Sequence, residues 1–404
     1  MTGPVDRAAV AVTVRRWQAG MEWRNAFLRW FGPGMLGGIT LGDWLRLLRE
    51  NRFDVSPRSF VRAGAITCQS AQNSVLRWVE NRRYAQVVRD ADVQPPVFVL
   101  GHWRSGTTHL HNLLTVDERL AFPNNYQALF PHAFLSMEAA QSPFIQWFLP
   151  ARRPMDNIEW TMRSPQEDEF ALCIMTFMSP CMGWFFPKRR DHYDRYLTFR
   201  GVDEGEVKRW QAALLEYVER LSWKYKRPLV LKSPPHTARI RRLLEIFPRA
   251  KFVHVHRDPY AVFSSTRKML TVNFSMHCLQ RPPTDDLDDW IIRQYRATYD
   301  AFFEERGLIP PGQYHEVCFE ELEVEPIGQI ERVYEGLGLP AFSVTRPALE
   351  RYVAGLRGYR KNEFPEPPAA LRRRLADAWR PCFEQWGYAP EVNGDRFEGS
   401  AGTS

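Results

Sequence analysis

Long apolar runs and closely spaced cysteines are both missing from this sequence of 404 residues. No stretch approaches the roughly 18 uninterrupted apolar residues that a membrane-spanning helix needs. The first twenty residues carry Arg7, Arg15 and Arg16 around a short Ala/Val run, which is too interrupted for a secretory signal. These absences predict a cytoplasmic protein.

The cysteines are few, and no two of them form a Cys-x-x-Cys pair. In a chain of this length, scattered cysteines indicate free, mostly buried thiols in a reducing compartment. No spacing typical of metal ligands appears either, so we expect no metal cofactor. The six positions are Cys68, Cys173, Cys181, Cys278, Cys318 and Cys382.

The charge balance favours an anionic partner. The chain has 54 Lys and Arg against 47 Asp and Glu, a formal net charge of +7. A generally basic surface would give the same balance. Because neither a zinc-finger spacing nor an RNA-binding signature is present, we expect no nucleic-acid partner. A doubly charged nucleotide cofactor would fit this charge as well.

The first ninety residues have helical periodicity. Apolar residues recur at helical spacing over Arg16–Trp30 and Leu41–Glu50, and Arg58–Val88 has room for one or two more helices. We therefore expect residues 1–94 to form a helical N-terminal extension. Its Trp- and Arg-rich start, together with Phe31–Leu48, is compatible with peripheral contact to an anionic membrane, with packing on the catalytic domain, or with a dimer interface.

The remainder of the chain alternates strands and helices. Buried parallel strands are predicted at Val97–Leu100, Leu229–Leu231 and Lys251–Val255, with helices at Thr107–Leu114 and Thr237–Phe247. This alternation predicts an α/β fold with a central parallel sheet between layers of helices. We expect one domain over residues 95–392, followed by a flexible tail at 393–404.

A long insert, residues 117–228, separates the first two predicted strands. It is rich in Phe, Trp, Met and Pro, and its pattern predicts helices over 165–178 and 204–225. An insert of this size has structure of its own and is expected to face the substrate, above the carboxyl edge of the sheet. Its aromatic runs, at 144–148, 177–178 and 182–186 before the basic 188–190, suggest a hydrophobic pocket, although core packing is the commoner explanation for each residue taken singly.

Gly101-His-Trp-Arg-Ser-Gly-Thr-Thr108 follows the first predicted strand and opens a helix. Two glycines at this spacing make an anion cradle from backbone N–H groups and the helix N-terminus. A Walker motif would continue with Lys and Ser or Thr, but here the cation is Arg104 and two threonines follow. The missing Lys argues against ATP or GTP hydrolysis. A plain strand–helix turn is the alternative.

A second anion-binding element is predicted where the strand Lys251–Val255 ends. Arg257 lies at that end, Pro259 is well placed to open a helix, and Ser265 follows about two turns later. Arg257 and Ser265 could grip a second phosphate. Alternatively, Arg257 forms an ion pair with Asp258.

Together these two elements resemble those of the sulfotransferases that use 3′-phosphoadenosine-5′-phosphosulfate (PAPS), over roughly residues 96–388. The family's Pro-Lys/Arg-Ser-Gly-Thr-Thr/Ser loop is matched except that Trp103 replaces the Pro, a difference we attribute to local packing. The resemblance implies a P-loop-like fold and PAPS as donor. It assigns the 5′-phosphosulfate to Arg104, Ser105, Gly106, Thr107 and Thr108, the 3′-phosphate to Arg257 and Ser265, and a closing basic loop to Arg360 and Lys361.

The resemblance also implies transfer of a sulfuryl group to a hydroxyl, in preference to an amine. Arg104 and Lys232 match the family's cations beside the transferred group, and the reaction requires no metal. Members like this chain take the base from a carboxylate of the insert, which favours Glu167 narrowly over its neighbours Asp168 and Glu169. A capping box with Ser164 is the competing role of Glu167.

His236 is the rival base, although capping of the following helix is a slightly better interpretation. His109 and His111 are expected to be packing residues. The acceptor is expected to be a small or lipid-like molecule. Two other functions stay open at this point: a P-loop phosphotransferase, and a nucleotide-binding protein without catalysis.

Overall fold

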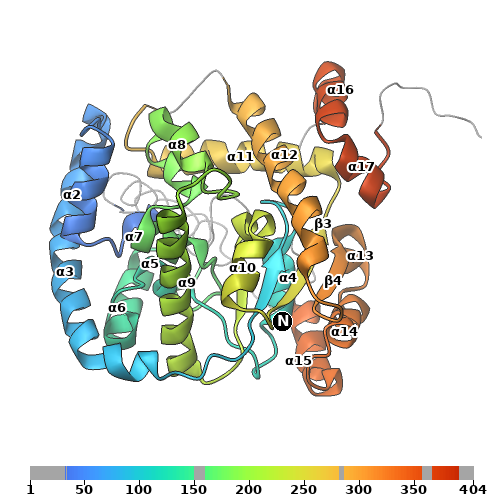
Figure 1. Cartoon of the computed structure of the whole chain (residues 1–404), viewed down its shortest axis with the longest axis horizontal. Helices are drawn as coiled ribbons and strands as arrows, with labels where there is room; N and C mark the ends of the chain where they lie inside the picture. The colour runs from blue at the N-terminus through green and yellow to red at the C-terminus, as the bar shows by residue number, and fades with distance from the viewer. Residues whose placement is uncertain (1–31, 33, 150–159, 282–285, 357–365, 391–404) are drawn as a thin grey trace, which may run out of the picture.

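The computed structural model describes residues 32, 34–149, 160–281, 286–356 and 366–390 (Figure 1). The helix expected over Arg16–Trp30, the basic loop with Arg360 and Lys361, and the tail at 393–404 lie outside the described residues. Among the described helices, none combines the length and the apolar character needed to cross a bilayer.

Four parallel strands form the central sheet, in the order β2-β1-β3-β4. They are β1 (Val97–Leu100), β2 (Val230–Lys232), β3 (Lys251–His256) and β4 (Tyr314–Cys318). Val97 of β1 pairs with Val230 on one side and with Lys251 on the other. The three predicted strands are therefore present within one residue of the predicted ends, and β4 is an additional edge strand.

Side chains of β1 alternate between two hydrophobic layers, as the pleat requires. Val97 and Val99 pack with α4 (Thr107–Leu114) and α14 (Pro326–Gly336), whereas Phe98 and Leu100 belong to the larger core on the other face. That second face carries η5 (Pro234–Ala238), α10 (Ile240–Ile246) and α12 (Leu287–Glu305). The predicted three-layer α/β fold is confirmed. In Figure 1, α13 (Phe319–Val324), α14 and α15 (Phe342–Gly355) gather beside β4.

The insert is mostly helical. The predicted 204–225 helix is α9 (Glu204–Tyr225), which Asp203 caps by accepting a hydrogen bond from the Gly205 amide. The helix predicted over 165–178 is shorter, because α7 (Glu169–Thr176) begins only after Asp168. Ser164 and Glu167 therefore do not form the capping box that was the competing interpretation of Glu167. The other insert helices are α5 (Asn125–Leu129), α6 (Phe134–Phe148) and α8 (Arg190–Asp194), with 3₁₀ turns η3 (Pro180–Trp184) and η4 (Pro187–Arg189).

The described part of the N-terminal region packs against this insert. It contains η1 (Gly34–Leu36), α2 (Leu41–Glu50), η2 (Pro57–Ser59) and α3 (Phe60–Arg89), and α3 lies beside α6 and α9 (Figure 1). Met35, Trp44 and Leu47 join the same buried core as the insert. The C-terminal part adds α11 (Pro259–His277), α16 (Ala369–Ala378) and α17 (Arg380–Trp386).

All four strands end at one edge of the sheet, because they are parallel. The segments that leave this edge are the Gly101–Gly106 loop after β1, Ser233 after β2 and Arg257 after β3. In open α/β folds, ligands bind at the carboxyl ends of the strands. The fold therefore brings the predicted cradle, the predicted second anchor and Lys232 to one edge.

Candidate active site

Backbone geometry requires glycine at both ends of the loop after β1. Gly101 has φ +141°, and a Cβ there would lie 2.6 Å from the Val255 carbonyl oxygen. Gly106 has φ +103°, and a Cβ there would lie 2.1 Å from Cδ2 of Phe319. Arg104 also has a positive φ, 70°, which is uncommon for a residue with a side chain. The loop is therefore a tight, conformationally special turn of the kind found at binding sites.

The loop has the donors expected of an anion cradle. Gly106 is the N-cap of α4, so the first backbone N–H groups of that helix, at Thr107 and Thr108, have no acceptor within the helix. The Ser105 hydroxyl is buried and has no hydrogen-bond partner among the described residues. Because buried hydroxyls are normally paired, these donors fit a phosphate or sulfate group.

The predicted second anchor lies directly beside this loop. Arg104 Nε donates to Ser265 Oγ over 2.9 Å, and Arg257 donates to the Arg104 carbonyl oxygen over 3.3 Å. Burial lowers the pKa of Arg257, and the charge of Arg104 acts in the same direction. A bound anion would relieve both effects. Asp258 instead caps α11, accepting hydrogen bonds from the Tyr260 and Ala261 amides.

Three consecutive carboxylates of the insert meet three basic residues at and after the end of β2. Glu167 Oε1 lies 2.7 Å from Lys232 Nζ. Asp168 Oδ2 lies 2.6 Å from His236 Nε2, and Glu169 Oε2 lies 2.8 Å from an Arg239 guanidinium nitrogen. These pairings explain why the capping box is absent. The Glu167 carboxylate, which a capping box with Ser164 would require, forms an ion pair with Lys232 instead.

Burial separates these three pairs into two kinds. The side chains of Asp168, Glu169, His236 and Arg239 have no exposed surface. Burial opposes ionisation of Asp168, but the charge and hydrogen bond of His236 outweigh it and lower the pKa of that carboxyl. His236 caps no helix, since α10 begins after Arg239 without a side-chain cap. The capping interpretation of His236 is therefore wrong.

Glu167 and Lys232 face the loop after β1. Glu167 keeps 14% of its side-chain surface exposed, whereas Lys232 is 2% exposed. Lys232 Nζ also lies 3.4 Å from Thr108 Oγ1. The ammonium group thus stands between the first turn of the loop helix and a carboxylate that solvent can reach.

A cavity of about 190 Å³ adjoins this group of residues. One end is formed by Arg104, Thr107, Thr108 and Glu167, and most of the remaining wall is apolar or aromatic. The wall combines the N-terminal region (Gly32, Gly34, Met35, Gly37), the loop (Trp103), the insert (Asn125, Leu129, Phe130, Ile145, Leu149, Trp160, Met162, Gln166, Phe170, Trp184), Pro234, and α11 (Met269, Asn273, Met276, His277). Sequence reasoning missed the contributions of η1 and α11, which no local motif indicates.

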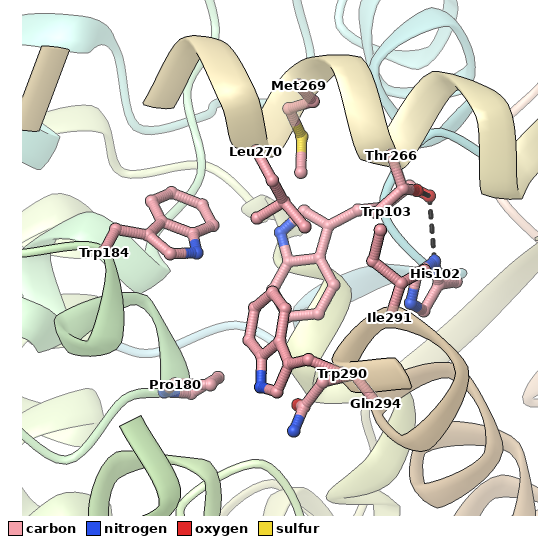
Figure 2. A pocket seen from close by; sticks show the side chains of 10 residues that line it. All are labelled: His102, Trp103, Pro180, Trp184, Thr266, Met269, Leu270, Trp290, Ile291 and Gln294. Carbon is pink, nitrogen blue, oxygen red and sulfur yellow. Dashed lines mark hydrogen bonds between the residues drawn. The ribbon is translucent and has the colours of Figure 1, made fainter. Parts of the chain in front are cut away.

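Trp103 forms part of the partition between this cavity and a much smaller one. Figure 2 shows its indole between Trp184 of the insert, Trp290 of α12 and side chains of α11. Trp103 and Trp184 line both cavities, with ring centroids 6.5 Å apart. The residue that departs from the family pattern is thus a buried wall of the larger cavity.

Only some residues of the predicted aromatic pocket line the cavity. Ile145 and Trp184 line the larger cavity, whereas Phe185 and Phe186 lie in the core. The basic residues at 188–190 bind other parts of the protein. Lys188 forms an ion pair with Asp54, Arg189 donates to the Glu50 carbonyl oxygen, and Arg190 forms an ion pair with Asp286. His111 is buried, and burial lowers its pKa to about 3, in keeping with the packing role expected of it.

Comparisons with known proteins agree with this geometry. Residues 95–343 match the model of a sulfotransferase family. The omega-hydroxy-beta-dihydromenaquinone-9 sulfotransferases Stf3 of Mycobacterium bovis and Mycobacterium tuberculosis are each 36% identical over 371 residues, covering 91% of this chain and 93% of the relative.

Two solved structures share the fold. Sulfotransferase STF9 from Mycobacterium avium has a TM-score of 0.66 at 21% identity, covering 84% of this chain and 89% of its own. Sulfotransferase STF1 from Mycobacterium tuberculosis has a TM-score of 0.57 at 16% identity, covering 83% and 92%.

Proposed function

Because this chain belongs to the sulfotransferase family and is a sulfotransferase, we propose that it sulfates the hydroxyl group of a hydrophobic, lipid-like alcohol with PAPS as donor. One observation carries the proposal: a mostly apolar cavity of about 190 Å³ ends at the phosphate loop and at Glu167. The Stf3 relatives are named for a hydroxylated menaquinone, which is an acceptor of this class.

The donor would be held by the cradle and the second anchor. The loop from Arg104 to Thr108 offers backbone N–H groups and the Ser105 hydroxyl, which has no partner in the described part of the chain, to the 5′-phosphosulfate. Arg257 and Ser265 bind the 3′-phosphate in this assignment, which the contacts of Arg104 with both residues support. When bound, PAPS supplies a sulfuryl group on a phosphate leaving group.

Glu167 is the proposed general base. Among the candidates Glu167, Asp168, Glu169 and His236, it alone lines the cavity where the acceptor hydroxyl would lie. The other three are fully buried, Asp168 and His236 in a pair with each other and Glu169 in a pair with Arg239, so an acceptor proton cannot reach them. A base must come within hydrogen-bond distance of the proton that it removes.

Lys232 is the proposed electrostatic catalyst. Its ammonium group is almost fully buried, where a charge acts more strongly than in water. It bridges Glu167 and Thr108, so it is placed to stabilise charge that develops between the acceptor and the cradle. Sharing the ammonium with that charge would also weaken its hold on Glu167 and leave the carboxylate more basic.

We further infer peripheral contact with an anionic membrane, from which a lipid-like acceptor would enter. The outer surface of α3 exposes Val75, Trp78 and Val79, and Arg82 stacks on Trp78 at 5.1 Å. Apolar and cationic side chains together on one helix favour binding at an anionic lipid interface. Co-sedimentation with phosphatidylglycerol vesicles tests this contact. Binding that Trp78→Ser leaves unchanged would contradict it.

The central experiment incubates the protein with radiolabelled PAPS and a panel of lipid alcohols, sugars and amines, without added metal. Sulfation of hydrophobic alcohols is expected, and labelling of soluble sugars alone would overturn the acceptor proposal. Calorimetry with 3′-phosphoadenosine-5′-phosphate (PAP) against ATP tests the donor site separately. Tighter binding of ATP than of PAP would contradict the assignment of the second anchor.

A further inference from the structure

Apart from Asn125 and Gln166, which hydrogen-bond to each other, two polar side chains interrupt the apolar wall of the larger cavity. Asn273 and His277 lie one turn apart on α11, and both line the cavity. Their relative exposures are 3% and 9%. Asn273 Oδ1 and His277 Nδ1 have no hydrogen-bond partner among the described residues. Since buried polar groups in proteins are nearly always paired, this pair indicates a missing partner.

Their place on α11 sets them apart from the reacting groups. The same helix carries Ser265, which bonds to Arg104, and Thr266, which bonds to the Trp103 carbonyl oxygen over 3.4 Å. At about 1.5 Å of rise per residue, Asn273 and His277 lie about 12 Å and about 18 Å beyond Ser265 along the axis. The cavity therefore runs along α11 from the phosphate loop to a polar far end.

The chemistry of the pair favours a neutral oxygen atom. Burial, together with the charge of Arg62, lowers the pKa of His277 to about 3, so the imidazole is uncharged near neutral pH. A neutral imidazole offers one donor and one acceptor, as a carboxamide does at its two ends. Either end of Asn273 can face the cavity, since a flip of the amide exchanges its oxygen and nitrogen.

We propose that Asn273 and His277 bind a second oxygen of the acceptor, a hydroxyl or carbonyl remote from the hydroxyl that is sulfated. The acceptor class is then an amphiphile with two separated oxygen functions joined by an apolar chain. This specificity rests on the proposed function, because it concerns the same acceptor cavity.

The test compares α,ω-diols with primary alcohols of the same chain length. At the length that spans the cavity, the protein should prefer the diol by roughly 10-fold in kcat/KM, as expected when a buried polar pair gains its hydrogen bond. Shorter diols should show no preference. An equal kcat/KM for diols and alcohols at every length would mean that the pair holds only water, and would overturn the proposal.

Two variants locate the preference in the pair. Asn273→Leu and His277→Phe should each bring the diol-to-alcohol ratio close to one. Ser275→Ala removes a polar group from the exposed side of the same helix, where the hydroxyl bonds to the Val272 carbonyl oxygen, and should keep the ratio. A ratio preserved in Asn273→Leu, with PAP affinity intact, would also refute the assignment.

A binding measurement separates this proposal from the proposed function. Calorimetry of the PAP complex with diol and with alcohol reports affinity without turnover. If no acceptor is sulfated but the diol still binds more tightly, the proposed reaction fails and the polar subsite stands. If alcohols are sulfated without any diol preference in binding or turnover, the proposed reaction stands and the polar subsite fails.

Discussion

Replacing Glu167 by Gln should remove most of the activity and little of the stability. The substitution keeps the size of the side chain and an oxygen that can accept from Lys232, but it removes the group that takes the acceptor proton. Loss of a general base typically lowers kcat by about 10²–10⁴-fold. Because a neutral amide oxygen replaces a charged carboxylate as the hydrogen-bond partner of Lys232, we expect the free energy of unfolding to fall by only about 1 kcal/mol.

The neighbouring Glu169→Gln is the matched control, with the opposite expectation. The Arg239 guanidinium, fully buried, would lose its counter-charge, although hydrogen bonds to the Tyr196 and Leu197 carbonyl oxygens remain. Breaking a buried ion pair in this way costs about 3–5 kcal/mol. The activity per folded molecule should change far less than in Glu167→Gln, since Glu169 does not line the cavity.

Two measurements on each variant test the assignment of the base. One is kcat at saturating PAPS and acceptor, measured from the release of PAP. The other is the free energy of unfolding, measured by guanidinium titration. If Glu167→Gln kept kcat within about 5-fold of the original, our assignment of the base by cavity access would be wrong. A His236→Asn variant that lost turnover while retaining stability and PAP affinity would assign the base to His236 instead.

Three further outcomes follow from the same geometry. Arg257→Ala should weaken PAP binding by about 10–100-fold in calorimetry, whereas Arg267→Ala, at an exposed position on the helix α11 that follows Arg257, should leave it unchanged. Gly106→Ala should abolish PAP binding because a Cβ collides with an aromatic ring there, and Gly201→Ala, also at positive φ but with open space around it, should not. Burial raises the pKa of Asp194 to about 7 from the ordinary 3.8, so the folded state prefers the protonated carboxyl and stability falls as pH rises through that interval. Between pH 5.5 and 8 the loss amounts to about 2 kcal/mol, and thermal melts of Asp194→Asn should lack it. An equal pH dependence in both proteins would show that another group is responsible.

The sequence predicts the first strand, the loop and the helix at Thr107–Leu114 closely because their signals are local. An apolar run, two glycines and helical spacing follow one another within eighteen residues. The edge strand β4 escaped prediction for the opposite reason. Its sequence, Tyr-His-Glu-Val-Cys, has one fully buried side chain, Val317, so it lacks the continuous apolar pattern of a central strand.

Only the residues of the candidate site that belong to sequence motifs were predictable. Arg104, Arg257 and Ser265 come together in the structure because they follow neighbouring strands at one edge. The cavity wall was not predictable, since Met35 and Asn273 reach it from segments with no shared local pattern. The capping box at Ser164 and Glu167 shows the limit of local rules. One hydrogen bond in a helix cap is replaced here by a charged pair across the fold.

In the mechanism we propose, three adjacent carboxylates have different roles: Asp168 and Glu169 stabilise the fold, and Glu167 is the base. Asp168 and Glu169 are held by His236 and Arg239 in pairs without exposed surface, and this holds the start of α7 against the segment after β2. Glu167 precedes those pairs directly, so its backbone has little freedom to move away from Lys232. A base placed in this way loses little entropy when the acceptor arrives, and reactions gain much of their rate from such prior positioning. In this proposal the two buried pairs contribute to turnover through the position of Glu167, so a variant that loosens them, such as Glu169→Gln, should lower kcat by a factor far smaller than Glu167→Gln does.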